Sequence, residues 1–72
     1  MNTDIEKLTK QADLRLQVQF IEGYCKTIYD LTDGSIEIGE SQKIETIREI
    51  STKMLNVINN YYKIEDEIKR ME

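Results

Sequence analysis

The chain has 72 residues, of which 14 are acidic and 10 basic, with a net charge of −4, one cysteine, no histidine and no proline. One cysteine excludes an intramolecular disulfide, and the lack of histidine removes the common zinc ligand set and the common proton shuttle of enzymes. The acidic balance argues against nucleic acid as the default partner, because phosphate binding needs clustered lysine and arginine.

Residues 1–72 show no break in composition, so one small domain is the natural interpretation. A monomer of this size supports a core worth only about 3–5 kcal/mol unless a disulfide, a metal or a partner adds stability. We expect neither metal nor cofactor, which leaves self-association or a partner protein as the source of extra burial. No apolar run approaches the ~18 residues of a membrane span, and the polar N-terminus does not resemble a signal peptide, so the sequence predicts a cytoplasmic protein.

The first predicted helix covers about residues 4–32. Thr3-Asp4-Ile5-Glu6 fits a capping box, in which the threonine hydroxyl and the glutamate satisfy free backbone N–H groups. One row of apolar residues follows along the segment: Ile5, Leu8, Ala12, Leu16, Phe20, Tyr24, Ile28 and Leu31.

Residues 14–20, LRLQVQF, alternate apolar and polar, which is typical of a half-buried strand. On a helix the same residues form two stripes, because Leu14 and Val18 fall together with Ile21 and Cys25, away from the first row. We favour the helix, since the only other alternating segment, 36–38, is too short to pair as a sheet. The strand stays open as an alternative at this point.

Gly23 lies inside the first predicted helix and costs about 1 kcal/mol relative to alanine. It is either a tolerated weak spot, with a slight bend, or a point of close approach by another helix, and we favour the first. Cys25 lies on the apolar stripe, which favours a buried small hydrophobic side chain over a reactive thiol.

A turn is predicted over residues 33–40, where Gly34 suits the left-handed conformation that ends helices. A second helix follows over about 41–70, with Ser41 or Glu40 near its N-cap. Its apolar residues are spaced alternately by three and four, a heptad series: Ile47, Ile50, Met54, Val57, Tyr61, Ile64, Ile68 and Met71.

These elements predict an all-α, two-helix antiparallel hairpin. A hairpin buries only the line of contact between its two helices, which we call the seam, and it has no interior. A second apolar stripe on each helix therefore stays exposed unless something covers it. On the second helix that stripe is Ile44, Leu55, Ile58 and Tyr62. We therefore expect two hairpins to pair as a homodimeric four-helix bundle, with Leu14, Val18, Ile21 and Cys25 contributed by the first helix.

Residues 51–61 resemble the second helix of the small sporulation-type aspartyl-phosphate phosphatases, which are also helical hairpins. The motif of that family reads S-Q-E-L-D, and Leu55 stands at its aspartate position. The resemblance therefore implies the hairpin architecture and no phosphatase activity.

The connection over residues 31–41 is similar to that in the small subunit of exonuclease VII, a hairpin that binds a catalytic large subunit. The family pattern is roughly L-E-x-G-x-L-x-L-E-E-S, often with a proline that this chain lacks. This resemblance implies an accessory role beside a larger enzyme subunit.

We expect a non-catalytic, protein-binding regulator, inhibitor or accessory subunit of bacterial or phage type, and no enzyme. Leu55, Tyr62 and Lys63 are the expected partner contacts, because tyrosine is over-represented at binding hot spots. Two alternatives stay open: a nucleic-acid-binding hairpin dimer, and a small subunit that supports a larger catalytic subunit.

Overall fold

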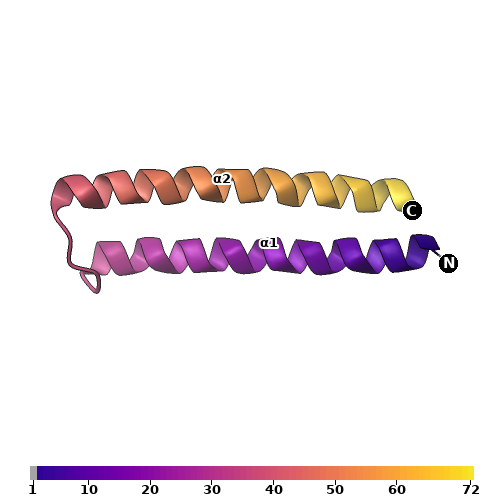
Figure 1. The fold of residues 1–72 in the computed structure, drawn as a ribbon, viewed down its shortest axis with the longest axis horizontal. Coiled ribbons are helices and arrows are strands. Elements are labelled where there is room, and N and C mark those ends of the chain that lie inside the picture. Colours follow the sequence, from indigo (N-terminus) through magenta and orange to yellow (C-terminus); the bar gives the residue numbers. More distant parts are fainter. Residues whose placement is uncertain (1) are drawn as a thin grey trace.

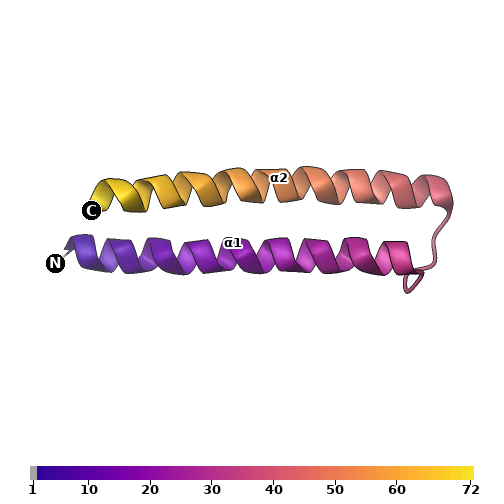
Figure 2. The same ribbon diagram turned by 180° about the vertical axis from the view of Figure 1, so that it is seen from behind.

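The computed structural model describes residues 2–72, which form two α-helices and the loop between them. Helix α1 spans Asn2–Asp33 and helix α2 spans Glu40–Met71, and the two run antiparallel, side by side along their length (Figures 1 and 2). They pack against each other, so the prediction of an all-α helical hairpin is confirmed. The hairpin measures 54 × 17 × 12 Å. Met1, the first residue of the predicted domain, lies outside the described residues.

Helix α1 is continuous, and residues 14–20 are helical within it, so the alternative of a strand is wrong. No atom lies within 4 Å of a Cβ built on Gly23, so α2 does not approach closely there. Thr3 lies inside α1, because the helix begins at Asn2. The expected threonine N-cap is therefore not formed.

The loop between the helices starts with Gly34, whose φ of +88° is the left-handed conformation predicted for it. The backbone N–H of Ser35 donates to Asp33 Oδ1 at 2.9 Å. Hydrogen bonding by the Ser35 side chain, and then by its backbone, lowers the pKa of Asp33 below its usual value of 3.8. At the other end of the loop Gly39 is the N-cap of α2 and forms no side-chain cap bond. Glu40, next to this N-cap, is the first residue of α2.

The heptad series of α2 faces α1, because all eight of its residues are buried or half-buried. The deepest side chains are Leu31 of α1, 1% exposed, and Ile68 of α2, 8% exposed. They lie near opposite ends of the hairpin, so the apolar seam extends along most of its length. Among the described side chains these two alone form a buried core.

The row of α1 that faces α2 differs from the predicted first row. It runs through half-buried or buried positions spaced by three and four: Lys7, Lys10, Leu14, Gln17, Ile21, Tyr24, Ile28 and Leu31. The first five residues of the predicted row are exposed, with Ile5 at 66% and Phe20 at 45%. The reason is geometric. Each step of four residues turns about 40° more than a full turn of the helix. A row of residues spaced repeatedly by four therefore moves around the helix and away from a straight partner helix.

Candidate protein-interaction surface

Large apolar side chains are exposed on both helices of the hairpin. On α1 they belong to two different faces, and on α2 they follow one stripe beside the seam. The exposed set on the helices is Ile5, Leu8, Leu16, Val18, Phe20, Tyr29, Ile44, Leu55 and Tyr62. Exposed apolar side chains in this number on a small chain are typical of an interaction surface.

Two adjoining hollows mark the middle of one side of the hairpin, and we call them together the central groove. The smaller hollow, about 220 Å³, is lined by Val18, Ile21, Ile58, Tyr61 and Tyr62. It takes residues from both helices and its lining is almost entirely apolar. The central groove is therefore the part of this side best suited to receive another apolar side chain.

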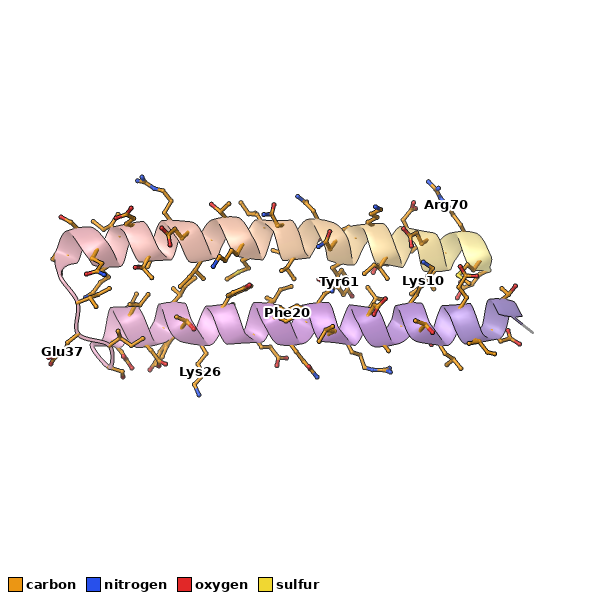
Figure 3. The ribbon with its side chains drawn as sticks, in the orientation of Figure 1. Lys10, Phe20, Lys26, Glu37, Tyr61 and Arg70 are labelled. Carbon is orange, nitrogen blue, oxygen red and sulfur yellow. The ribbon has the colours of Figure 1, made fainter. Side chains whose placement is uncertain are left out.

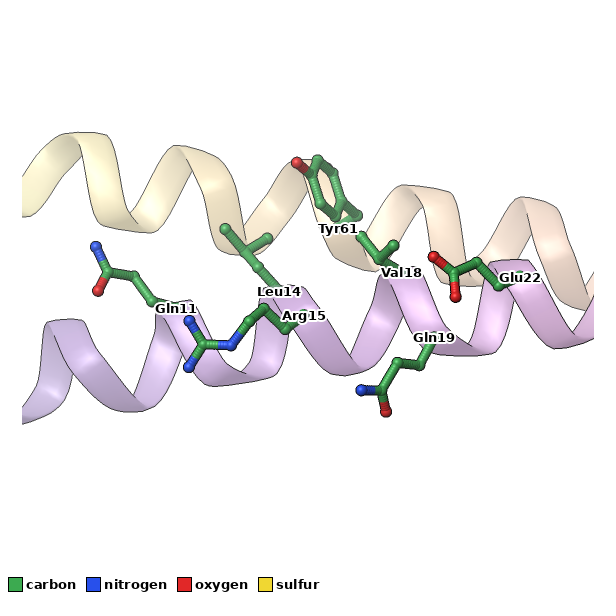
Figure 4. A pocket seen from close by; sticks show the side chains of 7 residues that line it. All are labelled: Gln11, Leu14, Arg15, Val18, Gln19, Glu22 and Tyr61. Carbon is green, nitrogen blue, oxygen red and sulfur yellow. The ribbon is translucent and has the colours of Figure 1, made fainter.

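The larger hollow, about 490 Å³, has a polar margin on α1. Leu14 and Val18 point toward α2 and Tyr61, while Arg15 and Glu22 stand at the margin of the hollow (Figure 4). Gln11 and Gln19 complete its lining. The central groove thus combines an apolar floor with one basic and one acidic side chain at its rim.

Tyr61 and Tyr62 form the aromatic wall of the central groove on α2. Their ring centroids are 5.9 Å apart and the rings are nearly perpendicular, at 81°. Edge-to-face pairs of this geometry are favourable. Tyr61 is half-buried in the seam, whereas Tyr62 is 62% exposed, so the pair extends from the seam to the surface.

The three residues predicted to contact a partner, Leu55, Tyr62 and Lys63, are all exposed. Leu55 lies seven residues before Tyr62, which places it on the same face of α2. Lys63 lies about 100° further around the helix from Tyr62. The structure therefore brings Leu55 and Tyr62 to one side of the hairpin and places Lys63 away from it.

The stripe predicted as the second contact surface of α1 divides between two environments. Leu14 and Ile21 are half-buried against α2, whereas Val18 is 40% exposed. Cys25 is exposed as well, contrary to the expectation of a buried side chain. Val18 and Cys25 are seven residues apart and share the side of the central groove.

The free ends of the helices are joined by ion pairs. Lys10 Nζ lies 2.5 Å from Glu67 Oε2, and Lys7 Nζ lies 2.8 Å from Glu72 Oε1. The hydrogen bond to Glu67 raises the pKa of Lys10 above its usual value of 10.5. The same hydrogen bond lowers the pKa of Glu67, and the one from Lys7 lowers the pKa of Glu72.

Sequence reasoning missed the rim of the central groove. Gln11, Arg15, Val18 and Glu22 are spaced by four, three and four, which predicts a common face on a helix. The sequence therefore shows the shared face. It does not show that the polar residues border a groove, because charged residues on a helix usually form a solvated face.

Within residues 2–72 neither helix is long and apolar enough to cross a membrane. The described part of the chain brings together no group of three acidic or cysteine side chains suited to hold a metal ion. Comparison with protein families, curated proteins and solved structures finds no match to this chain.

Proposed function

We propose that this chain is a non-catalytic protein-binding module, in which two hairpins pair as a four-helix bundle and the bundle binds a larger protein as a regulator, inhibitor or accessory subunit. The observation that supports this proposal is the contrast between a core of two buried side chains and a long series of exposed apolar ones. A chain of this kind gains most of its burial from association, because its own seam is thin.

The area of the hairpin supports the same conclusion. Its accessible surface is 5615 Å². A compact monomer of this mass exposes only about 4,650 Å², by the scaling of surface with mass. The excess, roughly 950 Å², is similar to the ~800 Å² that each partner buries in a standard protein interface.

The geometry does not favour the nucleic-acid alternative. Lys7 and Lys10, two of the basic residues that would have to contact phosphate, are paired with Glu72 and Glu67. Phosphate contacts would have to break these pairs, and the net charge of −4 opposes the approach of a polyanion.

The test has two stages. Light scattering coupled to size-exclusion chromatography, over a tenfold dilution series, should give twice the chain mass. Affinity capture from a lysate of the source cells should then recover one protein with the wild-type chain and lose it with Lys63→Ser, and with Leu55→Ser where that variant still gives twice the chain mass. The matched control is Lys26→Ser on the outer side of α1. A chain that captures nothing would contradict partner binding.

A further inference from the structure

We propose that the central groove is the contact between two copies of this chain, related by a two-fold axis that lies between the copies, at right angles to the helices and level with residues 18 and 19 of α1. This inference rests on the proposed function, because it specifies the pairing of the two hairpins. In this geometry the loops of the two hairpins lie at opposite ends of the bundle, and the α1 helices of the two copies pack antiparallel on each other.

The first support is the position of the central groove. Val18 and Tyr61 line both of its hollows, and Val18 lies at the middle of α1, which runs from Asn2 to Asp33. A two-fold axis at mid-length lets a second copy cover the same length of helix on both chains. A contact centred near one end would leave half of each hairpin uncovered.

The second support is charge complementarity at the rim. Arg15 and Glu22 both line the larger hollow and are both exposed. An antiparallel pair of α1 helices that crosses between residues 18 and 19 brings Arg15 of one copy level with Glu22 of the other. The symmetry repeats the contact, so two opposite-charge pairs flank Val18.

The third support comes from α2. Ile58 and Tyr62 line the smaller hollow together with Val18. Their midpoint is residue 60, so the same axis brings Ile58 of one copy level with Tyr62 of the other. The apolar floor of each groove thus receives an aromatic ring from the second copy, and the contact is self-complementary, as an isologous interface requires.

A charge swap tests this geometry. We expect Arg15→Glu and Glu22→Arg each to raise the dimer dissociation constant at least about 10-fold, because each turns two attractions into repulsions. The double variant, with both swapped, should return to within about threefold of wild type. Lys53→Glu is the control, because it changes net charge as much as Arg15→Glu does, while Lys53 is exposed and lies nine residues before Tyr62, on the opposite side of α2.

The outcomes separate a failure of this dimer geometry from a failure of the proposed function. A double variant that dimerises no better than either single one overturns the two-fold arrangement, while the wild-type dimer and the proposed function still stand. A wild-type chain that stays monomeric at every concentration overturns both the arrangement and the bundle. Circular dichroism of each variant confirms that its helices are formed.

Crosslinking gives an independent measurement. In a Cys25→Ser background, Val18→Cys places one thiol of each copy beside the axis, and a short bifunctional maleimide should join them rapidly. The native Cys25 is the matched comparison, because it is exposed but lies about 20 Å from its counterpart in this geometry, from the helical rise. Equal crosslinking of both positions would overturn the proposed axis.

Discussion

Lys10 and Glu67 join the two helices across the seam, with Nζ 2.5 Å from Oε2. Lys10 extends from α1 toward α2 (Figure 3). Lys10 occupies a position of α1 that faces α2, where a coiled coil has an apolar residue. The seam is therefore apolar near the loop and polar on the α1 side near the free ends. We expect the free ends to open first, because α1 contributes Lys7 and Lys10 rather than apolar side chains to this part of the seam.

Removing the charge at Glu67 should loosen the free ends of the hairpin. Glu67→Gln leaves Lys10 without its anionic partner, and we expect faster amide hydrogen exchange in the last two turns of α2 and the first turns of α1. Asp66→Asn is the control, because Asp66 pairs with Arg70 within α2, at 3.0 Å. Exchange that speeds up equally in both variants would show that the pair across the seam has no special role.

The pH dependence of stability follows from the same ion pairs. The pKa values of Glu67 and Glu72 are lowered in the folded chain, so their contribution is complete above their usual pKa of 4.5 and is lost as the pH falls through the folded values. The pKa of Lys10 is raised, so its contribution is complete below 10.5 and is lost above it. Thermal unfolding followed by circular dichroism should give a plateau between these limits and a lower midpoint on either side.

Leu31 is the side chain on which the fold depends most. Leu31→Ala should cost about 2–5 kcal/mol, because the side chain is 1% exposed and its removal leaves a cavity. A chain with so thin a core should then be largely unfolded. Leu8→Ala is the matched control, since Leu8 is 65% exposed and its loss should cost no more than about 0.5 kcal/mol. Urea denaturation of both variants measures the difference.

The seam of α2 was predictable because every one of its positions from Ile47 to Met71 is apolar, so the pattern is unambiguous. The seam of α1 was not. Lys7, Lys10 and Gln17 occupy positions that face α2, while Leu16 and Phe20 remain exposed. On α1 the row with the most apolar residues is therefore not the row that faces α2. The row that a straight partner helix can contact is the one whose residues are spaced alternately by three and four.

The candidate surface was predictable only in part, for a related reason. Val18, Ile58 and Tyr62 carry an apolar pattern that the sequence shows directly. The hollows between them depend on which row of α1 faces α2, and hence on the rotation of each helix about its own axis. That rotation follows from packing along the whole seam rather than from any single segment.

Replacing Gly34 should weaken the turn. Its φ of +88° is strained for any residue with a Cβ, so Gly34→Ala should cost about 1–2 kcal/mol. Gly39→Ser is the control, because Gly39 has an ordinary φ of −62°, no atom lies within 4 Å of an added Cβ, and serine is favoured at the N-cap position that Gly39 holds. Equal stability of the two variants, measured by urea denaturation, would contradict the role assigned to Gly34.

Gly23→Ala should stabilise the hairpin. Gly23 lies in the middle of α1, is exposed, and has no atom within 4 Å of an added Cβ. Alanine should gain about 0.8–1 kcal/mol from its higher helix propensity. For a chain of this size that gain raises the midpoint of thermal unfolding by about 4–8 °C. Both chains must be measured at one concentration, because association makes the midpoint depend on it. A lower midpoint would mean that another chain packs closely against Gly23, as an added methyl group would then clash.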